Sequence, residues 1–388
     1  MGSATIDVIA VAAQEIERVS LDLAASSHLL LEEGRKYPAE TISNHVGGGG
    51  SNAAVAAARL GWRSAVLAVV GDDRNARAVR AHLQENGVAV EALRENPAAE
   101  TGVSVMLAAR RGNATVLVHR GANETLAEGD LADATFAGAD LVHIAPLSGG
   151  SADRFPALVE QAAWAGAMVS VNPGIRHLRS RSDAFLGALG GVRLLSLNAR
   201  ELAALVPALI ALELAREAPA ADRAMGRDGD AHKGDAEKRE RPSKPSPPAP
   251  SRGRLRGAIL EEQGRRVRFE DLLGALHGAG PGFISVTDGA GGSYLSLASS
   301  KGAAEADRSE PTGPGPALLH EPAAAAPVVR GTAGAGDAYA TTLACALAEG
   351  AAPETAMRRA ALNAASVVGR VNTTDGLLSK QALKEALG

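Results

Sequence analysis

Short apolar runs alternate with segments of helical spacing along most of the chain. Six runs have the length of buried strands: 6–13, 64–71, 139–145, 166–172, 192–198 and 282–289. Helical spacing with glycine stops marks the segments at 52–61, 75–87, 153–166 and 269–280. The alternation predicts an α/β fold, in which helices cover both faces of a parallel sheet.

Two stretches depart from this pattern, at 27–46 and 102–119. The second has two runs rich in β-forming residues around the turn at 110–113, which predicts a hairpin. We expect its alternating apolar residues to share one face: Val103, Val105, Leu107, Val116 and Val118. Together the segments at about 13–46 and 98–120 predict a small β lid that stands off the main sheet.

Two segments look like insertions into a single domain that spans 1–388. Residues 216–256 are charged, rich in proline and poor in large apolar side chains, which predicts a disordered insertion. The basic cluster at 238–256 could instead dock a partner. Residues 299–321 are rich in glycine, proline and charge, and we expect a loop there.

Composition narrows the function classes. Apolar residues make up 46% of the chain, enough for a sizeable core, and the formal net charge of −4 provides no basic field for nucleic acid or a membrane. The single cysteine, Cys345, excludes an internal disulfide and a cysteine-based zinc site. No run resembles a signal peptide or a transmembrane helix, so we expect a cytoplasmic protein.

The stretch GTAGAGDAYA, at 331–340, sets glycines and alanines before an aspartate where a helix begins. Small residues at a helix N-terminus leave backbone N–H groups accessible to an anion. Asp337 then stands in the first turn of the helix. The alternative is a simple turn whose aspartate complements the helix dipole.

Three other polar or glycine-rich motifs fall at strand ends or helix starts. GGGGSN (47–52) can bind hydroxyl groups through backbone N–H groups and the Asn52 amide, or serve only as a flexible hinge. NARE (198–201) can position Mg²⁺ and phosphate, or form a capping box. TDGAGG (287–292) can let a nucleotide lie on the backbone, or form a plain hairpin turn. Neither a Walker loop nor a dinucleotide fingerprint is present.

The order of these motifs resembles the ribokinase-like (PfkB) carbohydrate kinase family. The resemblance includes GDD (71–73) and RGAN (120–123), and covers nearly the whole chain apart from the two insertions. It implies a three-layer α/β/α sandwich with a mostly parallel sheet and a small β lid. It also implies transfer of the γ-phosphate of ATP to a sugar hydroxymethyl group, with Mg²⁺ as cofactor, and a homodimer formed through the lid.

The same resemblance implies a role for each candidate residue. Asp337 matches the catalytic base, and the helix start before it matches the anion hole. The matched residues are Gly334, Ala335 and Gly336 for the anion hole; Gly48, Gly49 and Asn52 for the sugar; Asn198, Thr287, Gly289 and Asn363 for the nucleotide and its phosphates; and Glu201 for Mg²⁺.

Two departures affect what the chain binds. The family has a glycine after its first strand and, five residues later, an aspartate that holds sugar hydroxyls; our alignment puts Ala12 and Glu17 there, which leaves the acceptor open. Gly331 replaces an aspartate of a monovalent-cation site, so potassium activation is in doubt. A nucleoside kinase of the same family and a non-catalytic sugar- or nucleotide-binding regulator are the alternatives.

Overall fold

The structure is a computed structural model that describes residues 1–13, 18–20, 27–29, 31–108, 115–131, 136–219, 255–298, 316–326, 331–370 and 372–387. Its largest sheet has the strand order β11-β12-β13-β16-β17-β18. These strands are β11 (Leu141–Ile144), β12 (Met168–Val171), β13 (Leu194–Asn198), β16 (Phe283–Thr287), β17 (Ser293–Leu297) and β18 (Ala317–Glu321). The first four strands run parallel, as four of the apolar runs predict, and β17 and β18 add an antiparallel edge.

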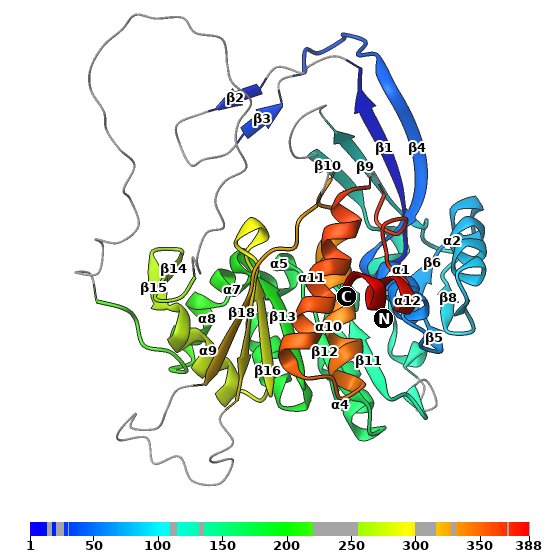
Figure 1. The fold of residues 1–388 in the computed structure, drawn as a ribbon. Helices are drawn as coiled ribbons and strands as arrows, with labels where there is room; N and C mark the ends of the chain where they lie inside the picture. The colour runs from blue at the N-terminus through cyan, green and yellow to red at the C-terminus, as the bar shows by residue number, and fades with distance from the viewer. Residues whose placement is uncertain are drawn as a thin grey trace, which may run out of the picture.

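Helices cover both faces of this sheet, which gives three layers (Figure 1). Alternation along β13 shows the reason: Leu194 packs with the helices of one layer, and Leu195 with those of the other. The first layer holds α10 (Ala335–Ala348) and α11 (Pro353–Val368). The second holds α4 (Phe155–Trp164), α5 (Ile175–Ser180), α6 (Ser182–Gly187), α7 (Ala199–Ala204), α8 (Val206–Ala211) and α9 (Phe269–Gly278). The expected α/β sandwich is therefore confirmed.

A second sheet of four strands stands off this body as the lid (Figure 1). Its order is β10-β9-β1-β4, formed by β1 (Thr5–Ala12), β4 (Ala39–Gly47), β9 (Gly102–Ala108) and β10 (Thr115–His119). We expected the run at 6–13 in the main parallel sheet, and this was wrong: β1 pairs antiparallel with β4 and parallel with β9, inside the lid. An apolar run of this length fits either sheet, because both bury one side of it.

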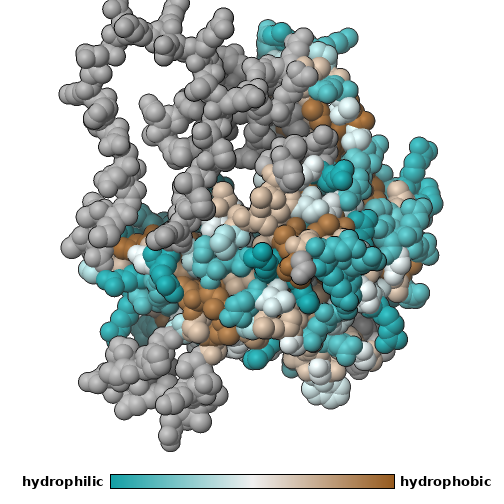
Figure 2. All heavy atoms as spheres, viewed as in Figure 1, coloured by the Kyte–Doolittle hydropathy of each residue, from teal (hydrophilic) through white to brown (hydrophobic). Residues whose placement is uncertain are grey.

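The hairpin of β9 and β10 is confirmed, but its apolar residues do not share one face. Val105 stands opposite Leu117, whereas Val116 stands opposite Met106 on the other side of the sheet. The alternation within each strand was read correctly; the register between them depends on the turn. That turn, at 110–113, lies outside the described residues. Both faces of the lid therefore carry apolar side chains, and brown surface marks the lid region in Figure 2.

The remaining elements belong to neither of these two sheets. Before the lid hairpin lie α1 (Gly49–Arg59), β5 (Ser64–Ala65), β6 (Ala68–Val70), α2 (Arg74–Glu85), β7 (Val88–Ala89) and β8 (Leu93–Glu95), and the strands of this group pair as β5-β7 and β6-β8. Smaller pieces are β2 (Arg18–Ser20), β3 (Ser27–Leu29), α3 (Gly150–Asp153), β14 (Ile259–Glu262), β15 (Arg265–Arg268) and α12 (Lys380–Leu387).

The two expected insertions fall mostly on residues that the structure does not describe, at 220–254 and 299–315. Strand β18 occupies the last five residues of the range 299–321, where a loop was expected. Strand β18 escaped notice because the glycine and proline before it dominate the composition of that stretch. No helix among the described residues is long and apolar enough to cross a membrane.

Candidate active site

The N-termini of α1 and α10 meet below the lid, although 285 residues separate them in the chain. Asn52 of α1 donates from Nδ2 to Oδ2 of Asp337 in α10 at 2.8 Å. A Cβ atom added to Gly49 would stand 3.5 Å from the other carboxylate oxygen of Asp337. The structure thus brings two of the sequence motifs, 47–52 and 331–340, into one site.

Gly334 is the N-cap of α10 and has a φ of 77°, a backbone conformation that glycine adopts without strain. A Cβ there would approach Cβ of Thr373 to 2.7 Å. Thr373 in turn donates from Oγ1 to Oδ1 of Asn52 at 2.9 Å, which turns the amide nitrogen of Asn52 toward Asp337. Thr373 was not among the residues predicted for the site; it lies in the polar run at 372–375, which could have drawn attention to it.

The first turn of α10 presents backbone donors. Ala335 N–H bonds to the carbonyl of Thr332 at 3.4 Å. Within the described chain, the N–H groups of Gly336 and Asp337 bond to no other backbone group. Gly336 is exposed, and a Cβ added to it would meet open space. These two donors are therefore available to an anion that approaches the helix end.

The carboxyl ends of β13 and β16 hold the next group of predicted residues. Asn198 ends β13 and stands in register with Thr287, the last residue of β16. Asn198 also caps α7: its Oδ1 accepts from the N–H of Glu201, and its own N–H donates to Oε2 of Glu201, both at 2.9 Å. The capping-box alternative is thus present. Gly289, with a φ of 53°, opens the adjoining turn, and a Cβ there would meet open space.

Burial shifts the pKa values of the carboxyl groups around Asp337. Burial raises the pKa of Asp337, the hydrogen bond from Asn52 opposes this, and the nearby charge of Asp7 adds to it. Burial likewise raises the pKa of Glu201 to about 7, with a further contribution from Asp337. Asp337 therefore lies within electrostatic range of a carboxyl group on β1 and another on α7.

Asp7 is the functional candidate that the sequence reasoning missed. It is 5% exposed and accepts from Oγ of Ser104 at 2.6 Å and from Oγ1 of Thr5 at 3.0 Å. The glycine-to-aspartate spacing that we assigned to Ala12 and Glu17 also occurs at Gly2 and Asp7, and this was the overlooked signal. Glu17 lies outside the described residues, and Ala12 pairs with Ala39 at the opposite end of β1 from Asp7.

Asn363 does not join the other predicted residues. Its side chain is fully buried between α10 and the chain that follows α11. Its Nδ2 donates to Oγ1 of Thr342 at 2.7 Å, and its Oδ1 accepts from the N–H of Leu378 at 2.8 Å. Both ends of the amide are thus engaged in holding helices together, so Asn363 offers no group to a nucleotide in this structure.

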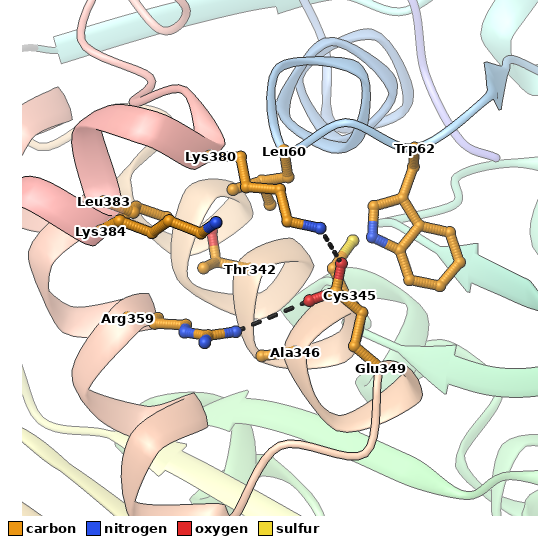
Figure 3. A pocket seen from close by; sticks show the side chains of 10 residues that line it. All are labelled: Leu60, Trp62, Thr342, Cys345, Ala346, Glu349, Arg359, Lys380, Leu383 and Lys384. Carbon is orange, nitrogen blue, oxygen red and sulfur yellow. Dashed lines mark hydrogen bonds and ion pairs between the residues drawn. The ribbon is translucent and has the colours of Figure 1, made fainter.

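Two cavities lie beside the long helices, and neither is lined by Asp337, Asn52 or Glu201. One of about 60 Å³ lies near the C-terminal end of α10, where Lys380 and Arg359 both face Glu349, at 3.0 and 3.6 Å (Figure 3). The other, of about 410 Å³, opens between α1, β5 and β11. The candidate site is therefore identified by the Asp337 carboxylate and the backbone donors beside it, and not by the volume of a cavity.

Comparison with known proteins agrees with this assembly of motifs. A profile of the family described as pfkB family carbohydrate kinase matches residues 12–227, more than half of the chain. The chain belongs to this family. PfkB-family kinases phosphorylate sugars or nucleosides with ATP. A comparison with curated proteins found no match to this PfkB-family chain.

Solved structures of sugar and nucleoside kinases share the fold of this PfkB-family chain. Ribokinase from Arabidopsis thaliana, complexed with ribose and ATP, is 18% identical with a TM-score of 0.64, over 100% of this chain and 96% of that one. Nucleoside kinase from Methanocaldococcus jannaschii is 16% identical with a TM-score of 0.65, over 100% and 96%. Nucleoside kinase from Burkholderia thailandensis, in complex with inosine, is 14% identical with a TM-score of 0.64, over 99% and 95%.

The Glu201→Gln variant of this PfkB-family chain tests the burial of the Glu201 carboxyl group. Glutamine keeps an oxygen that can accept from Asn198. Because the folded pKa is raised from 4.5 to about 7, the stability that protonation contributes is lost as pH rises through that range. At about pH 8 the variant should be more stable than wild type by on the order of 1–3 kcal/mol, and the gain should vanish below about pH 4.5.

Urea unfolding across this pH range measures the difference. Glu354→Gln is the matched control, since Glu354 is an exposed first-turn glutamate of α11. A Glu201→Gln variant with wild-type stability at every pH would contradict the assignment.

Proposed function

We propose that the chain transfers the γ-phosphate of ATP to a hydroxymethyl group of a sugar, with Asp337 as general base. The observation that carries the proposal is the Asp337 carboxylate, which Asn52 holds between two glycine-rich helix N-termini. A carboxylate with a raised pKa is suited to take a proton from an attacking hydroxyl. Phosphoryl transfer otherwise needs positioning and charge stabilisation, which the surrounding elements supply.

The first turn of α10 is proposed as the anion hole. The N–H groups of Gly336 and Asp337 stand beside the proposed base. Donors fixed by the helix stabilise negative charge on the moving phosphoryl group without having to reorient. The open space at Gly336 leaves room for that group, and the left-handed Gly334 lets the chain enter the helix there.

The nucleotide is proposed to lie over the ends of β13 and β16, against Asn198, Thr287 and Gly289. No cluster of three metal-binding side chains occurs in the described part of the chain. This fits Mg²⁺, which in kinases binds through one or two carboxylates, waters and the phosphates themselves. Glu201 is the proposed carboxylate, since a half-buried carboxyl with a pKa near 7 gains from an adjacent cation. Bound Mg²⁺ would neutralise charge on the phosphates.

The acceptor is proposed to lie against Gly48, Gly49, Asn52 and Asp7. Asp7 takes the hydroxyl-binding role that we first expected of Glu17, because it is the carboxylate near Asp337. A nucleoside remains the second candidate acceptor. The fold matches the nucleoside kinases as well as it matches the ribokinase, with TM-scores of 0.64 to 0.65.

A panel of sugars and nucleosides, assayed for ADP release with ATP and Mg²⁺, tests the proposed reaction. We expect one class to be phosphorylated and Asp337→Asn to lose turnover on the order of 10²–10⁴-fold, because an amide cannot accept the proton. ATP binding and folding should remain. If the wild-type chain phosphorylates nothing, or if Asp337→Asn keeps its rate, the proposal fails.

The Asp7→Asn variant tests the acceptor carboxylate. The Asp7 charge raises the pKa of Asp337, so its removal should lower that pKa and let activity persist to lower pH. Loss of a charged hydrogen-bond partner should also raise the acceptor KM by about tenfold or more, with the ATP KM unchanged. Asp271→Asn, on the exposed side of α9, is the control. An unaltered pH profile together with an unaltered acceptor KM would remove Asp7 from the site.

We also propose that the chain forms a homodimer through the lid. Ile42 and Leu117 are 67% and 64% exposed on the lid face opposite Asp7, and Val116 and Val118 are 43% and 50% exposed on the Asp7 face. A thin sheet with apolar side chains on both faces is marginal unless another surface covers it. A second lid is the cover that this chain itself can provide.

Light scattering at micromolar concentration should give twice the monomer mass for the wild type. Ile42→Lys combined with Leu117→Lys should yield monomers and weaken acceptor binding, while ATP binding stays nearly intact, because charges at the interface oppose association. Trp164→Lys is the control, since Trp164 is 90% exposed on α4, away from the lid. A wild-type mass equal to one chain would refute the dimer.

A further inference from the structure

Two motifs of the chain, at 71–73 and 120–123, have no part in the proposed reaction, yet both meet the strands that enter the lid. Strand β9 begins directly after Thr101, and β1 begins directly after Ala4. Each of these two residues is held by one buried or half-buried polar side chain from the body. The contacts are specific enough to suggest a role beyond general stability.

Asp73 holds the start of β9. Its Oδ2 accepts from the N–H of Thr101 at 2.8 Å, and its Oδ1 accepts from the hydroxyl of Thr101, also at 2.8 Å. The same hydroxyl accepts from the N–H of Gly71 at 2.9 Å. Asp73 also caps α2 through the N–H of Ala76 at 2.7 Å. One carboxylate therefore fixes Thr101, which is fully buried, to the start of a helix of the body.

Asn123 holds the start of β1. Its Oδ1 accepts from the N–H of Ala4 at 2.8 Å, and its Nδ2 donates to the carbonyl of Ala4 at 2.9 Å. The amide thus satisfies both backbone groups of one residue, as a neighbouring strand would. Asn123 is 8% exposed, and a Cβ on Gly102 would overlap its Nδ2, so the amide lies directly between the starts of β1 and β9.

The two anchor points stand in register with the proposed acceptor site. Thr5 pairs with Gly102, and Asp7 pairs with Ser104, so each anchored residue lies three positions before a member of the Asp7–Ser104 pair. A strand whose start is fixed has little freedom to slide or tilt three residues later. The hydrogen bond from Ser104 to Asp7 then aligns the two strands with each other.

We propose that Asp73 and Asn123 are positioning residues that act through Thr101 and Ala4 to place the Asp7–Ser104 pair against the acceptor. This rests on the proposed function, in which Asp7 holds acceptor hydroxyls. The hydrogen bonds of Asp73 and Asn123 reach neither the nucleotide motifs nor Asp337. Loss of an anchor therefore changes acceptor binding and leaves the ATP side of the reaction unchanged.

Thr101→Val tests the proposal because it keeps the shape of the side chain and removes the hydroxyl that joins Asp73 and Gly71. We expect its acceptor KM to rise by about tenfold, with kcat and the ATP KM within about twofold of wild type. Thr101→Ser should restore the acceptor KM. Thr125→Val is the matched control, since its hydroxyl makes two comparable hydrogen bonds, to Ala122 and from Asn96, and neither of them joins β1 or β9.

Hydrogen exchange provides a readout that needs no activity. Amides of 5–12 and 102–108 should exchange faster in Thr101→Val and in Asn123→Ala, while those of β12 and β13 stay as in wild type. Unchanged exchange in the lid strands of both variants would overturn the proposal. So would a fall in kcat without a change in acceptor KM, or an equal effect of Thr125→Val. Failure of wild type to phosphorylate any acceptor would instead reject the proposed function.

Discussion

The hydrogen bond between Asn52 and Asp337 sets the geometry on which the site depends. It joins residues of two helices that lie 285 positions apart in the chain, and it requires the N-termini of these helices to come within reach of a short side chain. That approach leaves no room for side chains: a Cβ on Gly49 would stand 3.0 Å from Ala145, and one on Gly334 would strike Thr373. Gly49 and Gly334 are therefore steric conditions for the contact, and the helix ends beside them leave backbone N–H groups that can bind an anion.

Hydrogen bonds of this kind explain why the site tolerates clustered carboxyl groups. Asp7, Asp337 and Glu201 each have a pKa raised by burial, so their ionised forms weaken the folded state at neutral pH. Hydrogen bonds offset part of this cost. Asn52 donates to Asp337, Ser104 and Thr5 donate to Asp7, and the backbone N–H of Asn198 donates to Glu201. Under the proposed function, the remaining cost is lost stability that a bound cation and bound hydroxyl groups would offset.

Much of this arrangement could be predicted from the sequence, and the errors have physical causes. The parallel strands, the helices on both faces and the motifs at 47–52, 198–201 and 331–340 follow from periodicity and from small residues at helix starts. Polarity alone does not distinguish a ligand from a structural amide, and in the structure the buried amide of Asn363 bonds to Thr342 and Leu378. Asp7 was missed because β1 is apolar enough to resemble a central strand, which hid the spacing from Gly2.

Strand β1 belongs both to the lid and to the candidate site. Side chains alternate along it, so Thr5, Asp7 and Ile9 face one side of the lid sheet while Ile6 and Val8 face the other. A shift of one residue in its register would remove Asp7 from the site and bury a valine in its place. The pairing of β1 with β4 and β9 on both sides opposes such a shift, and the polar anchors at Ala4 and Thr101 fix where the pairing starts. Which side chain β1 presents to the proposed acceptor site is therefore decided where the strand leaves the body.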